Sequence, residues 1–90
     1  MKTLVITPYL QDYHIFLQDK ELPRQTEQYK PVLSGHDLRG WRPSTRGVNK
    51  EIIILNLNRI TDLVGKRYHD VREAIMIAER VGFILRYEEV

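Results

Sequence analysis

The sequence predicts an α/β protein, a single small domain over residues 1–90 with a mostly parallel four-stranded sheet and two crossover helices. The order of the elements is strand–helix–strand–strand–helix–strand, with no internal repeat and no linker. Strands that alternate with helices are typical of a parallel sheet joined by right-handed crossovers. A chain of 90 residues is also long enough to bury one modest hydrophobic core.

The first half of the chain predicts a strand, a helix and a weaker strand. Residues 2–7, KTLVIT, have an apolar centre of the kind found in buried strands. The apolar residues of segment 10–22 recur at helical spacing. We expect this helix to end before Pro23, which disfavours helical geometry in the residue that precedes it. Residues 29–34, YKPVLS, form the next strand. Pro31 within it indicates either an edge of the sheet or an early position in the strand, because proline cannot donate to a strand ladder.

The second half predicts one deeply buried strand, a helix and a closing strand. Residues 51–57, EIIILNL, are apolar enough for a strand covered on both faces, so we expect this strand and the first strand to be central. Asp70, with Glu73 three positions later, has the spacing of a capping box and predicts a helix over 70–81. The segment FILRYEE then completes the sheet.

Composition excludes several classes of protein. The chain is 42% hydrophobic and 29% charged, as ordinary globular proteins are, and no segment is long and apolar enough to span a bilayer. The absence of cysteine excludes disulfides, thiol catalysis and cysteine zinc sites, and fits a cytoplasmic protein. A net charge of +2 is well below that of a strongly basic nucleic-acid binder.

Nucleotide chemistry lacks its usual residues. The turn after the first strand, residues 7–12, contains neither glycine nor lysine, which excludes both common phosphate-binding loops. Asn56 and Asn58 stand where many nucleotide hydrolases carry acids after a hydrophobic strand, and we interpret them as residues that turn the chain. The three histidines are far apart in the sequence, so we expect no metal site and no cofactor.

The strongest functional signal is the basic segment 35–50, GHDLRGWRPSTRGVNK, which holds the only tryptophan. Arg39, Arg42 and Arg46 are three or four residues apart, and guanidinium groups pair bidentately with anionic oxygens. Three interpretations are open. In the first, Trp41 packs under a solvated loop and has no binding role. In the second, the segment contacts a protein, since Trp and Arg dominate interface hot spots. In the third, the segment binds single-stranded nucleic acid by base stacking and phosphate contacts.

A second group of candidates follows the 51–57 strand, because ligands bind at the carboxyl ends of strands in open α/β sheets. The candidate binding residues are therefore His36, Arg39, Trp41, Arg42, Arg46, Lys50, Asn58 and Arg59. A hydrolase that uses His36 as a base oriented by Asp37 is a less favoured alternative, because the segment offers no evident nucleophile beyond two serines.

Three stretches resemble the first domain of helicase-type ATPases: LVITP, VLSG and EIIILNLNRITDLV. In a second register, HDLRGWRPSTRGVNKEIIIL resembles the Leu-Arg-Gly stretch before the acidic strand of phage packaging (terminase) and helicase ATPases. Small phage proteins without a phosphate loop are similar over most of the length. The resemblance implies a degenerate ATPase-like fragment from a phage or mobile element that keeps the sheet and has lost the chemistry.

We therefore expect a small non-enzymatic binding protein that serves as an accessory factor of a phage or mobile element. We expect it in the cytoplasm, which is the host cytoplasm if a phage encodes it. Its expected partner is a host or phage protein of the nucleic-acid-processing machinery, contacted through the loop around Trp41. The alternative is a single-stranded nucleic-acid-binding module that uses Arg39, Arg42 and Arg46. No membrane contact is expected, and an edge strand could pair two copies of the chain.

Overall fold

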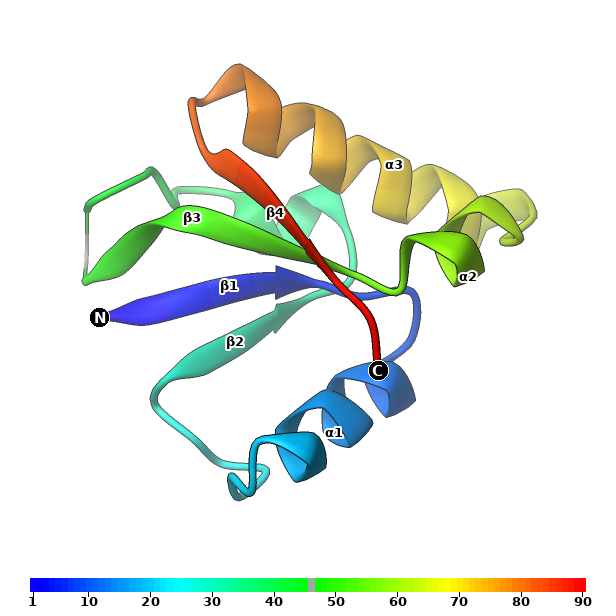
Figure 1. The fold of residues 1–90 in the computed structure, drawn as a ribbon. Helices are drawn as coiled ribbons and strands as arrows, with labels where there is room; N and C mark the ends of the chain where they lie inside the picture. The colour runs from blue at the N-terminus through cyan, green and yellow to red at the C-terminus, as the bar shows by residue number, and fades with distance from the viewer. Residues whose placement is uncertain (46) are drawn as a thin grey trace.

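The computed structural model describes residues 1–45 and 47–90, and it confirms the predicted α/β class (Figure 1). One helical layer lies on each side of a single sheet. In chain order the elements are β1 (Lys2–Ile6), α1 (Leu10–Asp19), β2 (Tyr29–Val32), the short 3-10 helix η1 (Gly35–Leu38), β3 (Val48–Leu55), α2 (Leu57–Thr61), α3 (Gly65–Arg80) and β4 (Ile84–Glu88).

The four strands are all parallel and lie in the order β2-β1-β3-β4. Leu4 of β1 is level with Lys30 of β2 and with Ile52 of β3, and Ile52 is level with Leu85 of β4. β1 and β3 are therefore the central strands, as the sequence predicts. The edge position predicted from Pro31 is also confirmed, because β2 has a neighbour on one side only.

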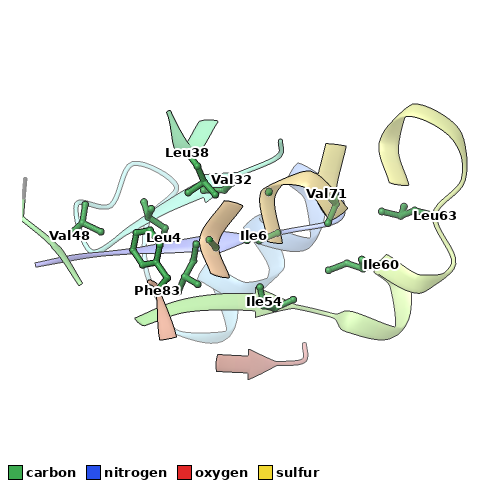
Figure 2. Packing of buried hydrophobic residues seen from close by; sticks show 13 residues of the cluster. Leu4, Ile6, Val32, Leu38, Val48, Ile54, Ile60, Leu63, Val71 and Phe83 are labelled. Atoms are coloured by element: carbon green, nitrogen blue, oxygen red, sulfur yellow. The ribbon is translucent and has the colours of Figure 1, made fainter. Parts of the chain in front are cut away.

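Alternation along the central strands divides the core into two clusters. Leu4 and Ile54 are fully buried toward η1 and α3, in a cluster that also receives side chains from β2 and α2 (Figure 2). Val5 and Ile53 point to the opposite face and pack against α1. The apolar run at 51–57 is therefore covered on both faces, as expected, although its strand begins earlier, at Val48, and ends at Leu55.

Helix α1 packs an aromatic face on the sheet. Tyr13, Phe16 and Leu17 are buried, and the Phe16 ring meets the Tyr29 ring edge-on with 5.0 Å between centroids. Burial, and to a smaller extent the neighbouring Tyr29, raises the pKa of the Tyr13 phenol. The helix ends at Asp19, three residues before the predicted end, and Glu21 adopts a left-handed φ of 58° in the turn that follows.

The predicted start of α3 is wrong. The helix begins at Gly65 after the extended Val64, so Asp70 lies inside it and does not cap it. The Asp70 carboxylate instead pairs with the cations one turn earlier, with Oδ2 at 3.2 Å from Lys66 Nζ and 3.7 Å from Arg67 NH1. Ion pairs between residues three and four positions apart stabilise a helix. Asp70 therefore contributes to α3 from inside the helix and not as its N-cap.

No helix in residues 1–45 and 47–90 has both the length and the apolar character needed to cross a membrane.

Candidate functional site

A groove lies between η1 and α3, at the basic segment predicted to bind. We call it the basic groove. Its volume is about 490 Å³, and arginines from two elements stand at it: Arg39 and Arg42 from the loop after η1, and Arg80 from the last turn of α3. All three side chains are exposed. The residues that line the basic groove are Gly35, His36, Leu38, Arg39, Gly40, Arg42, Glu73, Ile77, Arg80 and Val81.

Gly35 lets η1 approach α3 closely enough to form the wall of the groove. A Cβ atom built on Gly35 would lie 2.8 Å from Ile77 Cδ1 and would also collide with the Glu73 carboxylate. Real Cβ atoms do not make contacts that short, so the side chains of Glu73 and Ile77 would have to shift to admit a larger residue. Leu38, at the other end of η1, is buried in the core and holds the segment down.

Replacing Gly35 by alanine is expected to lower the free energy of unfolding by about 1 kcal/mol, the low end of the cost of overpacking, because the side-chain ends of Glu73 and Ile77 can move aside. Urea unfolding measures this change. Ile77→Val removes the Cδ1 atom that the new methyl group meets, so Gly35→Ala with Ile77→Val should recover part of the loss. Equal stability of Gly35→Ala and the unaltered protein would contradict this prediction, because it would mean that the side chains of Glu73 and Ile77 make room at no cost.

Trp41 anchors the loop that carries the groove arginines. Its side chain is partly buried and packs against the core cluster on the α3 face. The Trp41 N–H donates to the Leu38 carbonyl at 3.0 Å, and the Trp41 carbonyl accepts from Arg42 NH1 at 3.0 Å. The Thr45 hydroxyl in turn donates to the Arg42 carbonyl at 2.8 Å. The indole thus has a packing role whether or not it also touches a ligand.

The basic groove continues along α3. A second hollow of about 400 Å³ shares Glu73, Ile77 and Arg80 with the first and adds His69, Arg72 and Met76. Sequence reasoning missed Arg80 and Arg72, which lie outside the 35–50 segment. The spacing of Glu73, Ile77 and Arg80 at i, i+4 and i+7 places them on one helical face, but only the packing of η1 shows that this face borders the loop.

Three further candidates, Lys50, Asn58 and Arg59, lie away from the groove. Lys50 is an exposed residue of β3, and Asn58 and Arg59 belong to α2, at the carboxyl end of β3; none of the three lines the basic groove. Asn58 Nδ2 donates to Glu89 Oε1 at 3.2 Å. Arg46 lies outside the described residues. Of the eight candidates, His36, Arg39 and Arg42 line the groove, and Trp41 supports it.

Arg59 takes part in a buried polar cluster that the sequence did not reveal. Its Nε is 2.8 Å from the Oδ1 of Asp12, a buried carboxylate at the start of α1 that also accepts from Asn56 Nδ2 at 2.8 Å. Asn56 has a left-handed φ of 53°, consistent with the predicted turn, and its Oδ1 accepts from the Val90 N–H at 2.8 Å. The cluster joins the start of α1 and helix α2 to the carboxyl ends of β3 and β4, and its members satisfy one another's hydrogen bonds.

Asp37 has a structural hydrogen bond. Its Oδ2 accepts from the Leu33 N–H at 2.8 Å, which fastens η1 to the end of β2. His36 is exposed at the rim of the groove. Across residues 1–45 and 47–90, no three side chains of histidine, aspartate or glutamate gather closely enough to hold a metal ion.

The fold and the groove together define a small α/β protein with an arginine-lined groove between η1 and α3. No protein-family model, curated protein or solved structure matches this chain significantly.

Proposed function

We propose that the chain is a non-enzymatic binding protein whose basic groove holds an acidic segment of a protein partner. The supporting observation is the placement of three exposed arginines, from two different elements, around an apolar floor formed by Leu38, Ile77 and Val81. Carboxylates pair bidentately with such guanidinium groups, and the apolar floor suits the aliphatic side chains between them.

Three features favour a protein over single-stranded nucleic acid. Single-strand binders present aromatic faces on which bases stack, whereas Trp41 is committed in part to the core. Glu73 also stands in the groove, where its carboxylate would repel phosphates but could pair with a basic residue of a peptide. A net charge of +2 adds little long-range attraction for a polyanion.

The resemblance to helicase-type and packaging ATPases supports a partner in nucleic-acid-processing machinery, and the chain would then be a phage or mobile-element accessory factor in the cytoplasm. In this proposal Lys50, Asn58 and Arg59 are outside the contact surface, because they do not line the groove. The partner would approach the side of the molecule formed by η1 and α3.

A binding titration tests the proposal, with the sole tryptophan as reporter. Trp41 lies between two groove residues, Gly40 and Arg42, so its fluorescence should change when the groove is filled. The probes are a peptide of alternating glutamate and leucine and a mixed-sequence single-stranded oligonucleotide. We expect Arg42→Glu to weaken peptide binding at least about tenfold, since a charge pair becomes a repulsion. Arg24→Glu makes the same change in net charge at an exposed position outside the groove and should have little effect.

Two results would contradict this proposal. Equal losses in Arg42→Glu and Arg24→Glu would show that net charge alone, not the groove, attracts the peptide. Oligonucleotide binding with a log–log salt slope of about −2, as expected for three phosphate contacts on a single strand, would instead favour the nucleic-acid function.

A further inference from the structure

The outer edge of β4 is unprotected, unlike the opposite edge of the sheet. Edge strands are normally blunted by proline, lysine, bulges or short length. β2 is four residues long and contains Pro31. β4 contains no proline, lysine or bulge, and its charged residues Arg86 and Glu88 pair with each other within the chain. It exposes large side chains at Ile84 (51%) and Tyr87 (56%). In the described part of the chain no strand pairs with its outer side.

Hydrogen bonds at the end of β4 show which peptide groups face outward. The Glu88 carbonyl accepts from the Asn56 N–H at 2.8 Å, and the Val90 N–H donates to Asn56 Oδ1, so these even-numbered residues face β3. Successive residues of a strand direct their peptide groups to opposite sides. The N–H and C=O groups of Leu85, Tyr87 and Glu89 therefore point away from the sheet and are available to another strand.

Among registers centred on Arg86, Tyr87 or Glu88, the charges of β4 favour one pairing with a second copy of the chain. Side chains directly opposite each other in an antiparallel pair lie on the same face, closest at the positions that do not exchange hydrogen bonds. With Tyr87 opposite Tyr87 of the second copy, Arg86 faces the second copy's Glu88, and the reverse pair forms by symmetry. Shifting the centre to Arg86 would oppose two arginines, and shifting it to Glu88 would oppose two glutamates.

We infer that two copies of this chain associate through β4, antiparallel, with Tyr87 at the two-fold axis. The outward peptide groups of Tyr87 exchange both hydrogen bonds, and Leu85 and Glu89 continue the ladder. Ile84 lies opposite Val90 of the second copy, so two exposed apolar side chains are covered. Within one chain, Arg86 NH1 is 3.4 Å from Glu51 Oε1, and Arg86 NH2 contacts Glu88. These two contacts hold the Arg86 side chain on the sheet face where Glu88 of the second copy would lie. The result is a continuous sheet through both copies.

Sedimentation velocity over a roughly hundredfold range of protein concentration tests this inference, because self-association depends on concentration by mass action. The unaltered protein should shift from monomer to dimer. Arg86→Glu and Glu88→Arg should each weaken self-association at least about tenfold, since two attractive cross-strand pairs become repulsive. An equimolar mixture of the two variants restores opposite charges at both positions and should form a heterodimer at concentrations where neither variant dimerises alone.

Melting temperatures of the single variants serve as the control for folding, because Arg86 is exposed, whereas Glu88 is partly buried and also pairs with Lys20 Nζ at 3.7 Å. As a second variant, Tyr87→Pro removes an N–H that faces outward and has no partner in the monomer, so it should leave the fold intact and abolish the dimer. A monomer at every concentration, a dimer that is insensitive to Arg86→Glu, or a charge-swapped mixture that stays monomeric would each overturn the inference. Arg42→Glu, in the basic groove, should leave the dimer unchanged.

Discussion

Replacing Phe16 by alanine should lower the free energy of unfolding by about 3–5 kcal/mol, the usual cost of removing a buried phenylalanine. Phe16 is fully buried under α1, and its ring contacts Tyr29 edge-on and stacks near Tyr13 with centroids 6.4 Å apart. α1 is the one helix packed on this face of the sheet among the described residues, so the cavity has no second layer to fill it. Urea unfolding followed by circular dichroism measures the loss.

Ile15→Ala is the matched control for Phe16→Ala. Ile15 lies in the same helix and is 44% exposed, so its truncation removes few contacts. A surface change of this kind should stay within about 0.5 kcal/mol. Similar losses in the two variants would mean that α1 does not pack on the sheet through the face described.

Replacing Ile54 by alanine should cost about 2–5 kcal/mol on the opposite face. Ile54 is fully buried in central strand β3 and points into the cluster beneath α3 (Figure 2). Its neighbours come from β1, α2 and α3, and they cannot close the space without moving whole elements. Thermal melting at a fixed heating rate measures the effect.

Met76→Ala in α3 controls for the Ile54 change. Met76 is 50% exposed, so the same truncation to alanine should leave the melting temperature almost unchanged. If Ile54→Ala melted as Met76→Ala does, the assignment of Ile54 to the core would be wrong.

Much of the fold could be predicted because the sheet is buried on both sides. The unbroken apolar run before Asn56 predicts a central strand that is covered on both faces. Pro31 predicts that its strand lies at an edge of the sheet. The start of α3 could not be found in the same way. Asp70 and Glu73 match a capping box by spacing, but segment 65–69 is also compatible with a helix, and the local cations give Asp70 partners inside it.

The site was predictable only in part because its two walls are distant in the sequence. The spacing of Arg39 and Arg42 marks the loop, whereas the contribution of Arg80 depends on the contact of Gly35 with α3. Asp12 was missed for a related reason. A single acid in an amphipathic helix is usually exposed, and only the tertiary fold brings Asn56 and Arg59 to it.

The resemblance to helicase-type ATPases stays a prediction. The structure shows a parallel sheet with β1 in the middle, an arrangement common to many α/β proteins of different function. The residues that set the chain apart from those enzymes are the turn at 7–12, without glycine or lysine, and the neutral Asn56 and Asn58.

The position of β1 affects the order in which the chain can fold during synthesis. β1 is the first strand in the sequence but a central strand of the sheet, and Leu4 pairs with Ile52, 48 residues later. At about 5–20 residues per second the ribosome needs several seconds to supply that partner, and parallel pairings over long separations form slowly. The apolar Leu4, Val5 and Ile6 are therefore exposed on the nascent chain until β3 emerges, and refolding followed by pulsed hydrogen exchange should show late protection of their amides.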